Sequence, residues 1–223
     1  MNGKLLCRAI LRFFLGVLLV GGMIFWPAGT LRYGNGWLLM AILFGPMFGV
    51  GLVLLVKKPA LLASRLEGKE TQKGQSVLVK CCGLMFMAGF MLSGFGVRFG
   101  WYQLPPWVVL LSAGIFLFAY FLYALVLRAN TYLSRTIQVQ EAQQVVTTGP
   151  YAIVRHPMYS ATLLLFLSMP LVLGSVYAFL VFLLYPFLII KRLLKEEQLL
   201  VAQLPGYAEY QKKVTYRLIP WVW

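Results

Sequence analysis

The polar residues that could carry out chemistry are concentrated in one short stretch, residues 147–159, which reads TTGPYAIVRHPMY. It contains the only histidine of the chain, His156, beside Arg155, and a long apolar run follows directly. An arginine and the backbone N–H groups of a helix start suit an anionic ligand. The simpler interpretation is a membrane helix in which Arg155 reaches lipid phosphate and His156 contacts a backbone carbonyl. The stretch alone leaves both interpretations open.

A second polar cluster, KRLLKEE at residues 191–197, follows the last apolar run. Arg192 and Glu196 are four residues apart and would share a helix face, whereas Glu197 would point elsewhere. The ordinary interpretation is a solvated helix end with an ion pair. However, Glu196 and Glu197 are the only adjacent acids among six. Two unusual clusters that meet at one membrane face favour a functional site.

The composition indicates a protein that lies mostly inside a membrane. The chain has 223 residues, of which 61% are hydrophobic, and a formal net charge of +14. A soluble domain of this size could not bury so much apolar surface. The basic residues flank long apolar runs, which favours lipid headgroups as partners and argues against nucleic acid. The three cysteines have no metal-ligand spacing, so we expect reduced thiols and no metal site.

The apolar runs predict an all-α, polytopic membrane protein with about six transmembrane helices. Four spans are expected near residues 11–26, 37–56, 81–97 and 107–127, with a polar loop at 57–80. The region from Pro157 to Ile190 is predicted to form a helical hairpin that breaks near Gly174 and Ser175, although one long helix is an alternative. Each half would rise only ~24 Å, which is short for a ~30 Å bilayer core. Glycines in the first three spans indicate close helix packing.

The positive charges predict the orientation. With the N-terminus in the cytoplasm, every lysine and arginine except Arg32 and Arg98 lies on the cytoplasmic side. The hairpin then returns the amphipathic tail, residues 191–223, to the same side. We therefore expect both termini and the site to be cytoplasmic. The short chain shows no targeting peptide, which indicates a prokaryotic inner membrane.

The motifs resemble those of a known family. Gly149-Pro150-Tyr151 and Arg155-His156-Pro157-Met158-Tyr159, followed by Glu196-Glu197, are similar to the signature of integral-membrane methyltransferases. These include the isoprenylcysteine carboxyl methyltransferases and the phospholipid methyltransferases. The tail motifs GYAEY and RLIP, at 206–210 and 217–220, resemble the isoprenylcysteine branch. That branch often has a histidine where Gln143 stands.

The resemblance implies S-adenosylmethionine as the cofactor and assigns the site residues. The residues that would line the cofactor pocket are Val146, Gly149, Tyr151, Arg155, His156, Pro157, Tyr159 and Glu197. Arg192 and Glu196 would orient the methyl acceptor and carry the catalytic role. The chain would then divide into a four-helix membrane region, residues 1–128, and a cofactor-binding region, residues 129–223.

The sequence thus predicts a methyltransferase that acts on a lipophilic acceptor, either a small molecule or a lipidated substrate, in the bilayer. The acceptor group could be an isoprenylcysteine-type carboxylate, a lipid amine or an isoprenoid acid. One alternative is a membrane reductase of the sterol-reductase type that uses NADPH, and another is a non-catalytic lipid-binding membrane protein. The sequence does not indicate an oligomeric state.

Overall fold

The structure is a computed structural model and describes residues 3–66, 73–130, 132 and 143–223. The fold of these residues is built from helices, as the sequence predicts. In chain order they are α1 (Gly3–Ala28), α2 (Gly34–Lys57), α3 (Pro59–Leu66), α4 (Lys73–Arg98), α5 (Pro106–Ala129), the 3-10 helix η1 (Gly149–Ala152), α6 (Pro157–Val172), α7 (Val176–Phe182), α8 (Tyr185–Gln203) and α9 (Tyr207–Lys213).

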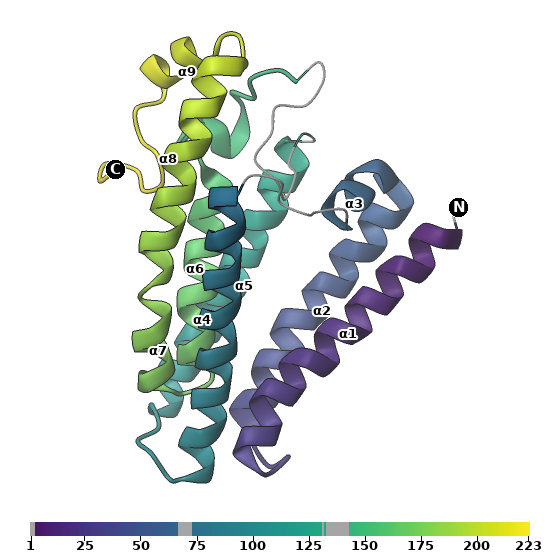
Figure 1. The fold of residues 1–223 in the computed structure, drawn as a ribbon, viewed down its shortest axis with the longest axis vertical. Coiled ribbons are helices and arrows are strands. Elements are labelled where there is room, and N and C mark those ends of the chain that lie inside the picture. The colour runs from purple at the N-terminus through teal and green to yellow at the C-terminus, as the bar shows by residue number, and fades with distance from the viewer. Residues whose placement is uncertain (1–2, 67–72, 131, 133–142) are drawn as a thin grey trace.

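The long helices form one elongated bundle (Figure 1). Helices α1 and α2 lie side by side as a pair, and this pair leans away from the other helices toward the end where the chain begins. The start of α1, the last turns of α8 and the short helix α9 all lie toward that same end. The arrangement agrees with termini on one side of a membrane, while the cytoplasmic orientation stays a prediction.

Among the residues that the structure describes, five helical segments are long and apolar enough to cross a membrane, so the chain is an integral membrane protein. They lie in α1, α2, α4 and α5 and in the stretch Val176–Gln203, which α7 and α8 form together. The remaining apolar helix, α6, has 16 residues. At 1.5 Å per residue it rises ~24 Å, less than a ~30 Å core. The structure therefore supplies five full-length candidates, and the sixth span stays a prediction.

The predicted break in the last apolar region is confirmed, because α6 ends at Val172 and α7 begins at Val176. Gly174 has a φ of 74°, which an L side chain rarely adopts, and a Cβ there would lie 2.8 Å from the Asn35 amide nitrogen. The Gly174 carbonyl accepts from the backbone N–H of Leu104 at 2.9 Å. Tyr33 donates its hydroxyl to the carbonyl of Leu173. The turn is thus fixed by the loops that follow α1 and α4.

The prediction of a polar loop at 57–80 was wrong at both ends of this range, because helices form there. Helix α3 forms at Pro59–Leu66, and α4 begins at Lys73, well before the predicted start of the third span. Proline is favoured at the first helical position, and the alanine and leucines of α3 are strong helix formers. The middle of this loop, residues 67–72, and residues 133–142 of the polar stretch before the motif lie outside the described residues.

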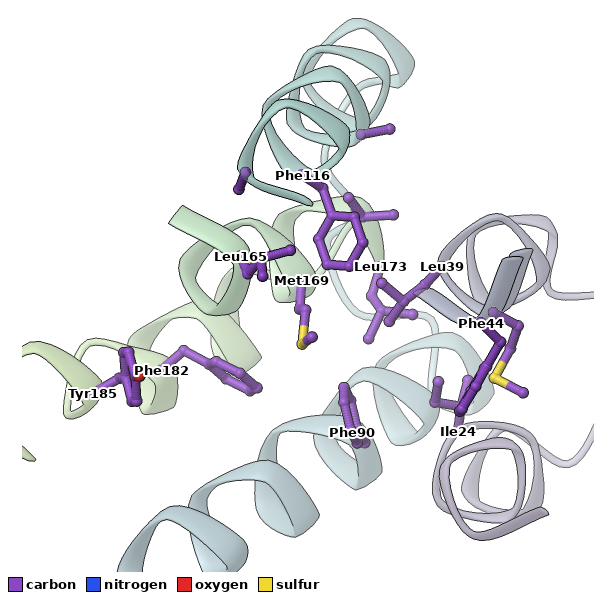
Figure 2. Close-up of a cluster of buried hydrophobic side chains, with 14 of the residues drawn as sticks. Ile24, Leu39, Phe44, Phe90, Phe116, Leu165, Met169, Leu173, Phe182 and Tyr185 are labelled. Carbon is purple, nitrogen blue, oxygen red and sulfur yellow. The ribbon is translucent and has the colours of Figure 1, made fainter. Parts of the chain in front are cut away.

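The core lies where α1, α2, α4, α5 and α6 meet α7 and the start of α8 (Figure 2). Phe116 of α5 and Phe182 of α7 are fully buried there, together with Ile24 and Leu39 from the first two helices. Helix α6 packs lengthwise against α5 and also contacts α8. Because α6 and α8 are held by this core, the polar residues at their ends have fixed positions.

The glycine prediction can be tested at α4. A Cβ on Gly94 would lie 2.5 Å from the Ile24 carbonyl oxygen and 3.0 Å from the Ala28 nitrogen, whereas Gly83 has no atom within 4 Å. We expect Gly94→Ala to lower stability by about 1–3 kcal/mol, because α1 must move away. Gly83→Ala on the same helix should be neutral or stabilising by up to ~1 kcal/mol. Thermal unfolding in detergent measures both, and equal effects would contradict close packing at Gly94.

Candidate active site

A buried carboxylate on α8 joins three segments that are distant in the sequence. Glu197 is 5% exposed. Its Oε1 accepts from Arg155 Nε at 2.7 Å, and its Oε2 accepts from Arg217 Nε at 2.8 Å. The Nε2 atom of His156 lies 3.3 Å from the same Oε1. The RHP motif, the acidic pair and the C-terminal tail therefore meet at one side chain.

The tail completes the surroundings of Arg155. The Nη1 group of Arg155 donates to the carbonyls of Val214 and Thr215, at 2.8 and 2.9 Å. The backbone N–H groups of Arg155 and His156 donate to the carbonyls of Tyr216 and Arg217, both at 2.9 Å. Two consecutive backbone N–H groups of the motif thus donate to two consecutive carbonyls of the tail, and the Arg155 side chain is held between the tail and Glu197.

A separate group of polar side chains, Tyr159, Arg192 and Glu196, lies where α6 faces α8. The Tyr159 hydroxyl donates to Glu196 Oε2, and Arg192 Nε donates to the Tyr159 oxygen at 3.2 Å. The rings of His156 and Tyr159 are stacked, with centroids 5.7 Å apart and an interplanar angle of 22°. This stacking connects the two clusters, so the residues of the RHPxY motif link the buried ion pairs to Arg192 and Glu196.

Buried tyrosines lie around the group formed by Glu197, Arg155 and His156. Asn130, at the end of α5, donates to the Tyr151 hydroxyl at 2.9 Å, and Tyr210 donates to the Tyr151 carbonyl at 2.7 Å. The Tyr207 oxygen lies 3.5 Å from His156 Nε2. Burial, reinforced by the negative charges of Glu197 and Glu196, raises the pKa of Tyr207 well above its usual range. Tyr207 therefore remains a neutral hydroxyl at physiological pH.

These groups border one cavity of about 390 Å³, which is within the usual range for small-molecule sites. Its α8 wall is a single helix face that changes from apolar residues near the helix start to charged residues two turns later. The lining residues of that face are Tyr185, Leu188, Ile189, Arg192, Glu196, Leu199 and Leu200. Helices α4, α5 and α6, residues 143–146, and the tyrosines of the tail form the other walls.

Most of the predicted site residues line this cavity. They are Val146, Tyr151, Arg155, His156, Tyr159, Arg192 and Glu196. The lining residues do not include Gly149, Pro157 or Glu197. Gly149 has a φ of 61° and begins η1, and Pro157 is the first residue of α6. Glu197 contacts the cavity-lining Arg155 and His156. The individual roles of these residues stay predictions.

The sequence did not single out Arg217, Tyr207 or Asn130 as site residues. Arg217 is one basic residue among many in the tail, and Tyr207 and Asn130 belong to no charged cluster. Only the RLIP and GYAEY tail motifs pointed toward the first two. Among the residues that the structure describes, no three His, Cys, Asp or Glu side chains gather as they would around a metal ion.

The ion pairs of Glu197 can be tested by stability. Removing one partner of a buried ion pair costs roughly 3–5 kcal/mol, because the remaining charge is left uncompensated. We expect a loss of this size in Glu197→Gln, which leaves Arg155 buried without its carboxylate. The exposed acid Glu209 provides the control, since Glu209→Gln should change stability by less than ~0.5 kcal/mol. Thermal unfolding of both variants in the same detergent measures these losses. Equal, small decreases in stability would mean that Glu197 is solvated and would contradict the buried ion pairs.

Comparison with known families identifies the region that carries this site. Residues 109–202 match the family model described as the isoprenylcysteine carboxyl methyltransferase (ICMT) family. No curated protein matches the chain. The matched region runs from α5 into α8 and contains Arg155, His156, Tyr159, Arg192 and the acidic pair, while α9 and the tail follow it. The match covers less than half of the chain, and the motif that the structure assembles lies within it, so the region from α5 into α8 is similar to the isoprenylcysteine carboxyl methyltransferase family.

Proposed function

We propose that the chain is a methyltransferase that uses S-adenosylmethionine and acts on a lipophilic acceptor within the membrane. The observation that carries the proposal is the change in polarity along one cavity. Near the tail, the cavity presents Arg155, His156 and buried tyrosine hydroxyls, while its other end lies between apolar helices. A polar cofactor and an apolar acceptor can therefore meet at the level of Tyr159 and Arg192.

The polar end suits the groups of the cofactor. S-adenosylmethionine supplies a methyl group on a sulfonium cation, together with a carboxylate, an amine and a ribose diol. Arg155 lines the cavity, and its guanidinium can attract the carboxylate while Glu197 fixes its orientation. The faces of Tyr159 and Tyr207 can stabilise the sulfonium by cation–π attraction. The buried carboxylate of Glu197 acts in this proposal through Arg155 and His156.

Arg192 and Glu196 suit the acceptor. Methyl transfer is a displacement at an already activated carbon, so the protein mainly aligns the two reactants and excludes water. Arg192 can hold a carboxylate acceptor, which needs no general base. An amine acceptor must lose a proton, and Glu196 could accept it. Because Tyr159 contacts both side chains, its hydroxyl can keep them in fixed positions.

The same site argues against the reductase alternative, since NADPH carries a further phosphate that needs additional basic groups. Besides Arg155 and Arg192, the described lining residues include no lysine or arginine. The proposed site is on the cytoplasmic side, in a prokaryotic inner membrane.

Cofactor binding is the first test. We expect S-adenosylhomocysteine, but not NADPH, to bind the detergent-purified protein in calorimetry. Arg155→Ala should weaken binding by at least about 10-fold, the effect of losing one charge-assisted hydrogen bond. Arg98→Ala should leave it unchanged, because Arg98 is an exposed cation at the end of α4 far in the sequence from the motif. NADPH binding would favour the reductase, and binding of neither ligand would favour a non-catalytic protein.

The acceptor type is tested by separating the roles of Arg192 and Glu196. For a carboxylate acceptor, Arg192→Gln should lower kcat/KM by about 10- to 100-fold through the lost charge-assisted contact, and Glu196→Gln should do less. For an amine acceptor the order should reverse, since Glu196 would be the base. Both variants are assayed by methyl transfer from radiolabelled cofactor. The two acceptors are a carboxylate and an amine that carry the same apolar chain. Unchanged rates in both variants would contradict the assignment.

A further inference from the structure

Tyr185 is the cavity-lining residue closest to the start of α8, and we call Tyr185, Thr162 and Phe166 the floor of the apolar end. Along the cavity face of α8, Arg192 is followed toward the helix start by Ile189, Leu188 and Tyr185. Arg192 lies seven positions after Tyr185, which corresponds to about 10 Å of helix axis. This distance is the depth available between the charged residues and the aromatic ring of Tyr185.

Two contacts of Tyr185 join α8 to α6 at the floor. The Tyr185 hydroxyl donates to the Thr162 hydroxyl oxygen at 2.9 Å. The Tyr185 ring meets Phe166 edge-on, with centroids 4.7 Å apart and an interplanar angle of 68°. All three residues line the cavity, and Tyr185 itself is only 3% exposed. The floor is therefore a connected surface that spans the space between two helices.

Below this floor lie aromatic rings, and a second, mainly apolar cavity of about 300 Å³ borders Phe86 among residues of α1, α2, α4 and α6. Phe86 of α4 contacts Phe166 at 4.7 Å and Phe182 at 5.2 Å between ring centroids. Phe182 is fully buried and lies beside Tyr185 at the margin of the core (Figure 2). A longer ligand would have to displace these rings, and protein cores resist such displacement because they are close-packed.

We propose that Tyr185, Thr162 and Phe166 limit the length of the apolar chain that the acceptor carries. This inference rests on the proposed function, and it adds a specificity determinant to it. An extended hydrocarbon advances roughly 1.25 Å per carbon, from a bond length of ~1.5 Å and a near-tetrahedral angle. A depth of about 10 Å therefore fits about eight main-chain carbons, the length of two isoprene units.

The competing path for a longer chain is sideways, between α4 and α8. Leu78, Val79 and Cys82 of α4 line the cavity opposite the α8 face, and Val79 is 46% exposed. A chain that left the cavity there would enter the bilayer and would not meet Tyr185. Binding should therefore stop improving with chain length if the chain meets Tyr185, and should keep improving if the chain leaves sideways.

Cys82 provides a reporter that does not depend on methyl transfer. It is a free, partly buried thiol that lines the apolar part of the cavity, whereas Cys7 and Cys81 are free and exposed. A Cys7→Ser/Cys81→Ser background leaves Cys82 as the single thiol. A ligand chain in the cavity should slow its reaction with a maleimide.

The experiment measures maleimide labelling of Cys82 with N-acetyl-S-alkylcysteines that carry one to four isoprene units, at equal mole fraction in detergent. We expect the half-protecting concentration to fall about tenfold or more from one unit to two, because more apolar surface is buried. It should not fall further for three or four units. Tyr185→Ala should extend the gain to the third unit. Tyr185→Phe keeps the ring and should retain the original limit.

Three outcomes would overturn the proposal: protection that keeps improving through four units in the unmodified floor, a Tyr185→Ala profile identical to that of Tyr185→Phe, or no protection by any probe. S-adenosylhomocysteine binding is measured in the same samples and reports folding. The same measurement distinguishes the length-limit proposal from the methyltransferase proposal. A length limit without cofactor binding would support the first and reject the second. Cofactor binding without a length limit would do the opposite.

Discussion

The site depends on one buried charge, that of Glu197. A carboxylate that is removed from water needs charged hydrogen-bond donors, and its two arginine donors come from different parts of the chain. Arg155 precedes α6, while Arg217 lies in the tail after α9. The ion pairs therefore fix the tail against the motif, and the backbone pairing of residues 155–156 with 216–217 follows from the same juxtaposition.

The hairpin of α6 with α7 and α8 gives the cavity its polarity. Because α6 starts directly at His156 and Pro157, its first turn lies level with the charged turns of α8, and Tyr159 can contact both Arg192 and Glu196. One turn deeper, the Thr162 hydroxyl oxygen accepts from the hydroxyl of Tyr185, the first residue of α8. A short distance along two facing helices thus separates a charged region from an apolar, aromatic one, as expected for a site that combines a polar ligand with an apolar one.

The members of the charged cluster have different geometric relations to the cavity. Arg155 and His156 line it, whereas Glu197 contacts both of these residues. Sequence similarity treats all three as parts of one motif. The structure distinguishes side chains that line the cavity from Glu197, which contacts them without lining it, and it shows that Arg217 contacts Glu197 in turn.

The sequence by itself determined the helical class, most of the membrane-spanning stretches and the break at Gly174, because apolar runs and turn-forming residues act locally along the chain. It also identified the motif residues, since polar side chains are rare in so apolar a protein. It missed α3 and the early start of α4, where local helix propensity outweighed polarity. Only the tertiary structure decided which charges pair, that Arg217 closes the cluster, and that Tyr185 meets Thr162. Those contacts join residues separated by 20 or more positions, and their geometry follows from how the helices pack, which no local pattern encodes.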